Sequence, residues 1–407
     1  MKLIDIMIPM SSPPRDVYIV YYKRTAFSRS RPNDPTKDVF NSIRMDEAIA
    51  YLLKDSVKAT GINPSLVNDV ILGSALQVGE NWMYGGRQPV LLAGFPVDVP
   101  AMAIDRACSS SLNAISIGAM EIMTGNSDLV LAGGFEHMTH VPLGDNPYVQ
   151  PNLKLLLRPE YMKYDMKTGF YMGLTAEKLA AVKGIGREEM DLYSLESHRL
   201  ASKALEEGYF KDEILPLEVE IQGETKVIDR DQSIRTDTTI EQMRKLPPAF
   251  KEGGLITAGN SSPLNAGASL VMLASGQKVR ELGLNPLSKI VSFGWAAVDP
   301  SIMGEGPVPA TRSALKKAGL DVDDIDLWEI NEAFAVVVLN AMKELGIERD
   351  KVNVKGGAIA IGHPLGASGA RLAGTLSRIL KQKGKDKGVA TLCVGGGQGY
   401  SMVLERV

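Results

Sequence analysis

The chain has 407 residues, a formal net charge of −3 and only two cysteines. This length exceeds one ordinary core and predicts two or three domains, or one large duplicated domain. The evenly mixed charges, without a basic block, argue against a nucleic-acid partner, and two cysteines are too few for a disulfide-stabilised secreted domain.

The N-terminal stretch is apolar, but Asp5 and the prolines that follow interrupt it before a signal-peptide core develops. No apolar run in the chain approaches the roughly 20 residues that span a bilayer. We therefore expect a soluble cytoplasmic protein with no membrane span.

Short apolar runs, rich in branched residues and bounded by turn formers, predict buried strands. In chain order they occupy residues 17–22, 69–75, 128–134, 289–298, 326–331 and 388–397. Helical patterns lie between them at 44–61, 110–125, 187–208 and 370–384. Because strands and helices alternate, the sequence predicts an α/β fold.

Two distant parts of the chain resemble one another. Residues 108–138 and 366–400 each run through a small-residue loop, a helix, a polar turn, a buried strand and a glycine cluster. Matching strand units precede them at 66–77 and 321–335. We predict two duplicated α/β halves with an irregular middle inserted between them. The predicted domains are 1–139 with 266–286 for the first half, 140–265 for the inserted loop domain, and 287–407 for the second half.

Cys108 is the first candidate for chemistry, because it lies where a strand-like segment gives way to a helix. Unpaired N–H groups and the macrodipole at a helix N-terminus favour a thiolate, which predicts a pKa below the usual value of about 8.5. The alternative is a small buried apolar residue, as most cytosolic cysteines are.

The three histidines that precede the second half are weak candidates for a functional site. His137 and His140 have the i, i+3 spacing of some metal ligands, but no further ligand is apparent nearby, so we predict no metal site. His198 falls in a charged helix and is predicted at the surface. Asn331 follows a strand and would position a water or an oxyanion, or would instead cap the next helix.

His363 and Cys393 complete the candidates. His363 lies in "GGAIAIGHPLGASGAR", and glycine clusters occur where backbone turns sharply or approaches a ligand closely. It would serve a cysteine nucleophile as base, or be a satisfied structural residue. Cys393 ends the corresponding strand of the second half, so a pseudo-twofold arrangement would turn both sulfurs toward one pocket. A phosphate-binding loop there is the rival, but it lacks the Lys-Ser/Thr of a P-loop.

Four motifs, "CSSS" at 108, "NEAF" at 331, the glycine-rich stretch at 356 and "CVGGGQG" at 393, resemble the thiolase family. Segments such as "MGLTAEKLA" and "GGLITAGNSSPLNAGA" follow in the family's order, so the resemblance covers nearly the whole chain. Within the family, these segments are most similar to those of degradative 3-ketoacyl-CoA thiolases. The resemblance implies a thiolase fold: two α/β halves back to back, each with helices on a mixed sheet, plus the loop domain.

The resemblance also implies the reaction, cleavage of a 3-ketoacyl-CoA to acetyl-CoA and a shortened acyl-CoA, or the reverse Claisen condensation. Cys108 would hold the acyl group, His363 would take its proton, and Cys393 would exchange a proton with the acetyl-CoA carbanion. One oxyanion hole would consist of His363 with a water held by Asn331. The other would use the backbone N–H groups of Cys108 and Gly395, and the glycines would keep the walls thin for the substrate.

The resemblance implies CoA as a substrate and no metal or redox cofactor. The CoA contacts carried over are Arg235 at the adenine end and Met172, Phe250, Ala258, Ser262 and Leu264 along the pantetheine. Expected protein partners are a second copy, as homodimer or dimer of dimers, and a neighbouring acyl-CoA enzyme.

Two other functions fit parts of the sequence. A decarboxylating condensing enzyme of the ketoacyl-synthase type shares the fold and a cysteine nucleophile, but it normally lacks a second cysteine such as Cys393. A catalytically silent scaffold subunit is the non-enzymatic alternative, although all four catalytic positions are filled here.

Overall fold

A computed structural model describes residues 14–144 and 146–407. The apolar N-terminal stretch considered above lies largely outside these residues. Among the described helices, none combines the length and the apolar character that crossing a bilayer requires.

One nine-stranded mixed sheet organises the molecule, in the order β3-β2-β4-β7-β1-β8-β11-β10-β9. The strands are β1 (Val17–Arg24), β2 (Asp69–Gly73), β3 (Ala101–Ile104), β4 (Leu129–His137), β7 (Ala266–Ser275), β8 (Ser288–Ala297), β9 (Leu327–Ile330), β10 (Lys387–Val394) and β11 (Gln398–Arg406). A separate hairpin pairs β5 (Leu217–Ile221) with β6 (Glu224–Ile228). Every predicted strand is present, whereas β3, β7, β11 and the hairpin were not predicted.

The strand order shows the duplication directly. In the first half, β2 pairs in parallel with β3 and β4, and β4, β7 and β1 follow in antiparallel register. The second half repeats this with β9 parallel to β10, followed by antiparallel β11 and β8. A single parallel bridge from Trp328 to Val352 takes the position that β3 has in the first half.

The two halves are less separate than predicted. The first strand of each half meets the other at Tyr18↔Lys289 and Ile19↔Ser288, so the two predicted sheets join into one. Among the described strands this short ladder is the pairing that joins the halves, and two helices also contact strands of both.

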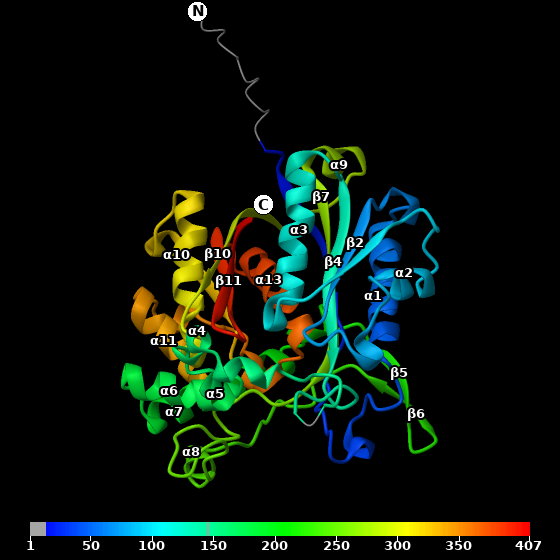
Figure 1. Ribbon diagram of the computed structural model, residues 1–407. Helices are drawn as coiled ribbons and strands as arrows, with labels where there is room; N and C mark the ends of the chain where they lie inside the picture. The colour runs from blue at the N-terminus through cyan, green and yellow to red at the C-terminus, as the bar shows by residue number, and fades with distance from the viewer. Residues whose placement is uncertain (1–13, 145) are drawn as a thin grey trace, which may run out of the picture.

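Those two helices, α3 (Ser110–Thr124) and α13 (Leu365–Lys383), pack against each other and lie in the centre of the molecule (Figure 1). α3 and α13 both contact β4, and α13 also contacts β10. Further helices cover the outer faces: α1 (Met45–Thr60), α2 (Arg87–Leu92) and α9 (Gly276–Glu281) on the first half, and α10 (Pro307–Ala318) and α11 (Ala335–Leu345) on the second. Because α3 and α13 are buried on nearly all sides, most of their residues are small or apolar.

α13 begins at Leu365, five residues before the predicted start at 370, so the "GASG" stretch is helix and not loop. A Cβ on Gly366 would lie 2.3 Å from the carbonyl oxygen of Phe135, and one on Gly369 would lie 2.3 Å from the backbone nitrogen of Leu112. These glycines therefore make room for neighbouring backbone, and not for a substrate as the sequence suggested.

Five α-helices of the described chain lie between β4 and β7 and gather at one end of the sheet (Figure 1). They are α4 (Pro159–Met162), α5 (Met166–Gly169), α6 (Met172–Lys183), α7 (Arg187–Glu206) and α8 (Ile240–Arg244). The proposed domain boundaries at 139/140, 265/266 and 286/287 fall close to the end of β4 and the starts of β7 and β8; the division itself stays a prediction.

Candidate active site

Cys108 lies in a one-turn 3-10 helix, Ala107–Ser109, between the end of β3 and the start of α3. Ala107 has a φ of 44°, a left-handed conformation that is costly for a residue other than glycine. The carboxylate of Asp105 accepts the Ala107 N–H at 2.7 Å, and the Arg106 N–H donates to Ser110 Oγ at 2.9 Å. The local structure thus imposes a strained turn directly before the thiol.

The environment of the Cys108 thiol differs from the sequence-based prediction. Burial raises its pKa to about 11; hydrogen bonds from the Gly395 and Cys108 N–H groups lower it, and the charge of Glu136 raises it further. The predicted depression by a helix N-terminus is therefore wrong. The apolar side chains of Ala75, Met138 and Leu365 pack around the sulfur, and the desolvation they impose outweighs the donors.

Cys393 is fully buried at the end of β10, where the strand opens into glycines. Burial raises the pKa of its thiol, and the neighbouring charge of Cys108 raises it further. The N–H of Gly395, two residues later, lowers the pKa of the Cys108 thiol, and β10 contacts the one-turn helix that holds Cys108. The structure thus brings the two cysteines of the chain into one environment.

Asn331 and His363 lie beside this pair. Asn331 follows β9 and donates its backbone N–H to Thr391 of β10 at 2.9 Å, next to the strand end that carries Cys393. Its side-chain Nδ2 lies 3.2 Å from Nε2 of His363. The N-cap of α11 is Phe334, so the alternative role of Asn331 as a helix cap is wrong. Its Oδ1 is buried and has no hydrogen-bond partner among the described residues.

The hydrogen bonds of His363 define its tautomer. The Ser368 hydroxyl donates to the Pro364 carbonyl at 2.8 Å, so Nδ1 of His363 donates to Ser368 Oγ at 2.6 Å and Nε2 carries the lone pair. Burial and the charge of Arg371 lower the pKa of His363 to about 3. The imidazole is therefore neutral at physiological pH. No hydrogen bond joins it to either sulfur within the described chain.

Two residues that support this site were missed by the sequence analysis. Asn265 Oδ1 accepts the His363 N–H at 2.8 Å, and at Gly362, whose φ is +123°, an added Cβ would lie 2.7 Å from the Asn265 amide. Glu136 accepts N–H groups of Ala75 and Gly366 at 2.8 and 3.0 Å, and burial raises its pKa to about 7. The available signal for Glu136 was a carboxylate within an otherwise apolar strand.

The residues carried over as CoA contacts have the following neighbours. A Cβ on Gly395 would lie 3.7 Å from the sulfur of Met172, and the half-exposed ring of Phe250 packs edge-on against Phe334 at 5.9 Å. Ser262 donates its N–H to the Ala333 carbonyl at 3.0 Å, beside that ring. Leu264 is exposed and accepts the Ser30 N–H through its carbonyl.

Arg235 and Ala258 line a cavity of about 200 Å³ together with His198. His198 is 6% exposed and accepts the Arg235 N–H at 3.3 Å through Nδ1, so its predicted surface position is wrong. Burial and the charge of Arg235 lower its pKa to about 4. Because α7 packs over segment 233–238, a helix that reads as charged presents one face inward.

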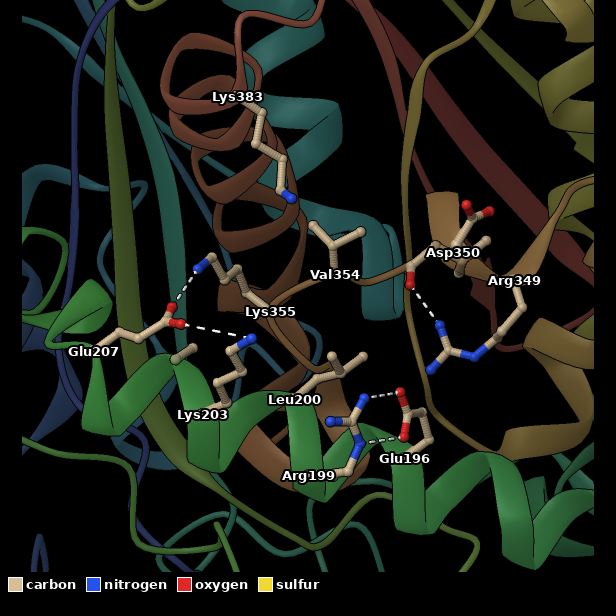
Figure 2. Close-up of a pocket in the computed structure, with 12 residues that line it drawn as sticks. Glu196, Arg199, Leu200, Lys203, Glu207, Arg349, Asp350, Val354, Lys355 and Lys383 are labelled. Atoms are coloured by element: carbon tan, nitrogen blue, oxygen red, sulfur yellow. Dashed lines mark hydrogen bonds and ion pairs between the residues drawn. The ribbon is translucent and has the colours of Figure 1, made fainter.

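A larger hollow of about 520 Å³ lies away from both sulfurs, between α7 and segment 349–355 (Figure 2). Three of its cations have acidic partners: Arg199 pairs with Glu196 at 2.6 Å, and Lys203 and Lys355 share Glu207 at 3.8 and 2.9 Å. Arg349 and Lys383, which also line the hollow, form no ion pair within the described residues, so part of its positive charge is uncompensated.

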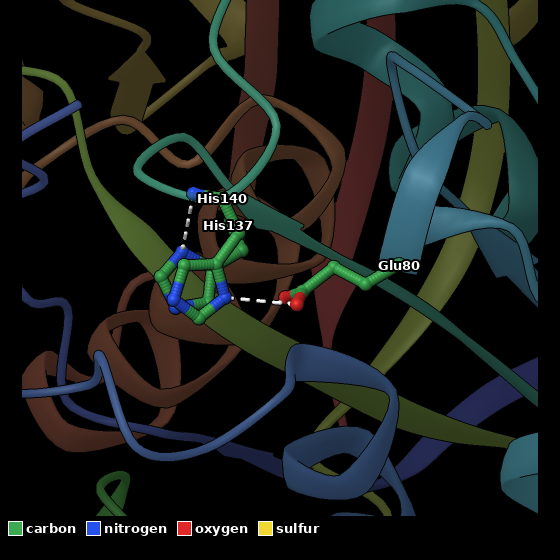
Figure 3. A group of neighbouring side chains, drawn as sticks. All are labelled: Glu80, His137 and His140. Carbon is green, nitrogen blue, oxygen red and sulfur yellow. Dashed lines mark hydrogen bonds and ion pairs between the residues drawn. The ribbon is translucent and has the colours of Figure 1, made fainter. Parts of the chain in front are cut away.

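The structure adds Glu80 to the two histidines considered for metal binding (Figure 3). The ring planes of His137 and His140 stack at 3.7 Å, and Glu80 lies 2.8 Å from Nδ1 of His140. The remaining ring nitrogens also have partners, the carbonyl of Phe40, the N–H of His140 and the side chain of Asn41. This favours a hydrogen-bonded cluster, and the absence of a metal stays a prediction.

The pKa values predict how Cys108 reacts with an alkylating reagent. With a pKa of about 11, the thiolate fraction increases tenfold per pH unit, so we expect iodoacetamide labelling to accelerate log-linearly from pH 7 to 10. Peptide mass spectrometry measures the rate, and Cys393 is expected to label more slowly because it is fully buried. A plateau below pH 8 would indicate a resting thiolate–imidazolium pair and contradict this picture.

Comparison with known proteins supplies independent findings. Residues 17–277 match the family model "Thiolase, N-terminal domain", and residues 284–406 match "Thiolase, C-terminal domain". A 3-ketoacyl-CoA thiolase of Marinobacter nauticus is 44% identical over 404 residues, covering 98% of this chain and all of that protein.

Solved structures are also similar to this chain over nearly its whole length. The acetyl-CoA acetyltransferase of Bacillus anthracis superposes with a TM-score of 0.87 at 38% identity, covering 98% of this chain and 100% of that one. Human mitochondrial 3-ketoacyl-CoA thiolase in complex with CoA gives a TM-score of 0.86 at 36% identity, covering 97% and 98%.

Proposed function

Because the chain belongs to the thiolase family, we propose that it cleaves 3-ketoacyl-CoA with CoA through an acyl-enzyme on Cys108. The protein is an acyltransferase, and its fold is the thiolase fold. Cys108, His363, Asn331 and Cys393 are the proposed catalytic residues.

In the proposed first step, the Cys108 sulfur attacks the 3-keto carbon while its proton passes to Nε2 of His363. The bond between C2 and C3 then breaks, leaving the acyl group on Cys108 as a thioester and a carbanion on acetyl-CoA. Cys393 gives its proton to that carbanion. Condensation of two acetyl-CoA molecules to acetoacetyl-CoA is the same sequence in reverse.

In the second step, the thiol of CoA attacks the thioester. Its proton replaces the one that Cys393 gave up, and His363 returns a proton to Cys108 as that sulfur leaves. Since His363 is neutral and Cys108 protonated in the free protein, the first transfer is favourable only as the sulfur–carbon bond forms. A neutral base whose Nε2 accepts the Asn331 amide N–H suits this timing, because that donor has only to move aside for the proton of Cys108.

Two sets of donors would stabilise negative oxygen. The N–H groups of Cys108 and Gly395 both lower the pKa of the Cys108 thiol, and such a pair of donors would stabilise a tetrahedral oxyanion on the attached carbon. The unpartnered Oδ1 of Asn331 suits a water that, with His363, would face the acetyl-CoA enolate. Both proposed oxyanion sites, Cys108 with Gly395 and His363 with Asn331, use the residues that the sequence analysis assigned to them.

The observation that carries this proposal is the contact between the one-turn helix that holds Cys108 and β10, which carries Cys393 at its end. The test is a substrate series: purified protein is assayed for CoA-dependent thiolysis of 3-ketoacyl-CoAs from four carbons upward. Thiolysis with a labelled acyl group on Cys108 supports the proposal. Absence of both at every chain length would overturn it.

CoA is the proposed co-substrate, with Arg235, Met172, Phe250, Ala258, Ser262 and Leu264 as its contacts and no metal or redox cofactor. A structural relative was solved in complex with CoA, which supports this. The ketoacyl-synthase-type and scaffold alternatives are not favoured by the matches to thiolases. We further propose a cytoplasmic homodimer or dimer of dimers that works beside a partner acyl-CoA enzyme.

Asn331→Ala is expected to lower kcat for thiolysis about 100-fold, because it removes the group that would hold the oxyanion water. Cleavage of the carbon–carbon bond should be affected more than simple exchange of an acyl group between Cys108 and CoA. Both rates are measured on the same preparation. An equal loss in the two reactions would show that Asn331 acts only on the position of His363.

A further inference from the structure

The loop that follows β1 carries arginines without a matching acid. Neither Arg29 nor Arg31 forms an ion pair within the part of the chain that the structure describes. Arg24, at the end of the same strand, is by contrast neutralised by Glu213 and Asp231 at 2.9 and 2.7 Å. A surface arginine normally needs no partner, but Arg29 is half-buried, where an uncompensated charge is costly.

A third arginine reaches the same place from the loop domain. The N–H of Gln232 donates to the Phe27 carbonyl at 2.9 Å, so residues 232–233 run beside residues 27–28. The Asn265 amide ties the two segments together, donating to the Ser28 carbonyl at 2.5 Å and lying 3.3 Å from Ser233 Oγ. Arg235, two residues further on, therefore lies next to this loop.

The charges of this arginine triad, Arg29, Arg31 and Arg235, act on one another. Burial and the positive charges of Arg31 and Arg235 lower the pKa of Arg29. The acid closest along the chain, Asp34, is exposed and pairs with Lys37 at 2.7 Å; the charge of Arg31 also contributes to lowering its pKa, so it compensates Arg31 only in part. An anion placed among the three guanidinium groups would remove this repulsion.

The same loop holds buried hydroxyl groups without partners. Ser28 and Ser30 are 0% and 4% exposed, and neither Oγ forms a hydrogen bond within the described residues. Buried polar groups in folded proteins nearly always have a partner. Together with the arginine triad, they indicate a site that is complete only when a polar ligand or its waters are bound.

We propose that the arginine triad binds the phosphate groups of CoA, so that Arg29 and Arg31 determine preference for the full cofactor over its phosphate-free fragment. This rests on the proposed function. The location fits, because the cavity of about 200 Å³ beside Arg235 has Met243, Leu246 and Ala258 as apolar lining for an adenine ring, with Asp237 as its one acid.

The test compares CoA, 3′-dephospho-CoA and pantetheine as acyl acceptors in thiolysis. Arg29→Ala and Arg31→Ala are each expected to raise the KM for CoA about 10-fold with little change in kcat, since each removes charge-assisted bonds to phosphate. The ratio of kcat/KM for CoA to kcat/KM for pantetheine should fall by the same factor of about 10. Arg29→Lys should recover part of the loss. If the substitution raises KM less for 3′-dephospho-CoA than for CoA, the contact is assigned to the 3′-phosphate. If the two KM values rise equally, it is assigned to the diphosphate.

Arg244→Ala is the matched control, because this exposed arginine of α8 is already paired with Glu188. Unchanged KM for CoA in both triad variants would overturn the inference, as would equal losses with CoA and pantetheine, which would mean structural damage. If Arg29→Ala fails to fold, Arg31→Ala decides alone. Failure of the proposed function is distinguishable, because wild-type protein would then not transfer acyl groups even to pantetheine.

Discussion

Replacing Cys108 with alanine is expected to abolish thiolysis, with kcat lowered about 10,000-fold or more, because no other group can store the acyl fragment. The Gly395 and Cys108 N–H groups both lower the pKa of this thiol, which places two backbone donors near the sulfur. Incubation with labelled acetyl-CoA followed by peptide mapping should show the label on Cys108 in the wild type and none in the variant.

The control for Cys108→Ala is binding of CoA, which should survive because the proposed CoA contacts do not include Cys108. Stability should change little, since the half-buried side chain loses one atom. Residual turnover within 100-fold of wild type would mean that acyl transfer proceeds without a covalent intermediate. That outcome would remove the central step of the mechanism.

Cys393→Ala is expected to separate the two halves of the reaction. Loss of the proton donor should lower thiolysis of a 3-ketoacyl-CoA about 100- to 10,000-fold, the usual contribution of a positioned acid or base. Exchange of an acyl group between acyl-CoA and free CoA needs no carbanion and should persist. Exchange of the methyl protons of acetyl-CoA with D2O, followed by mass spectrometry, should disappear in the variant.

The matched variant for this test is Cys393→Ser, which preserves volume but is far less acidic and should resemble alanine in proton exchange. Intact condensation from malonyl-CoA in either variant would instead support the decarboxylating alternative. Loss of acyl exchange together with proton exchange would mean that Cys393 supports the geometry of Cys108, next to which it lies, and does not carry the proton.

The sequence was sufficient for the elements with strong local signals. The strands at 17–22 and 69–75 and the helices at 44–61 and 110–125 appear almost as predicted, because branched apolar runs and helical periodicity are properties of single segments. β3, with four residues at a sheet edge, and β11, which begins inside a glycine cluster, give no such signal. Their formation depends on pairing with strands elsewhere in the chain.

In the candidate site too, the sequence identified the residues, whereas the tertiary structure determined their ionisation and their support. Cys108, Asn331, His363 and Cys393 were identified from their motifs, but their ionisation depends on burial and neighbours from other segments. The pKa of Cys108 is raised and not lowered, since apolar packing and Glu136 exceed the local effect of a helix terminus. Asn265, which fixes the backbone of His363, lies in a loop far from it in the sequence.

By itself, the sequence determined the family, the alternation of strands and helices, and the residue types available for acyl and proton transfer. Only the tertiary structure decided that the two halves share one sheet, that the glycines of α13 accommodate neighbouring backbone, and that arginines from two separate loops face one another. The physical reason is that residue chemistry and local periodicity are encoded locally. Desolvation, electrostatic repulsion and close packing depend on distances between segments that only folding brings together.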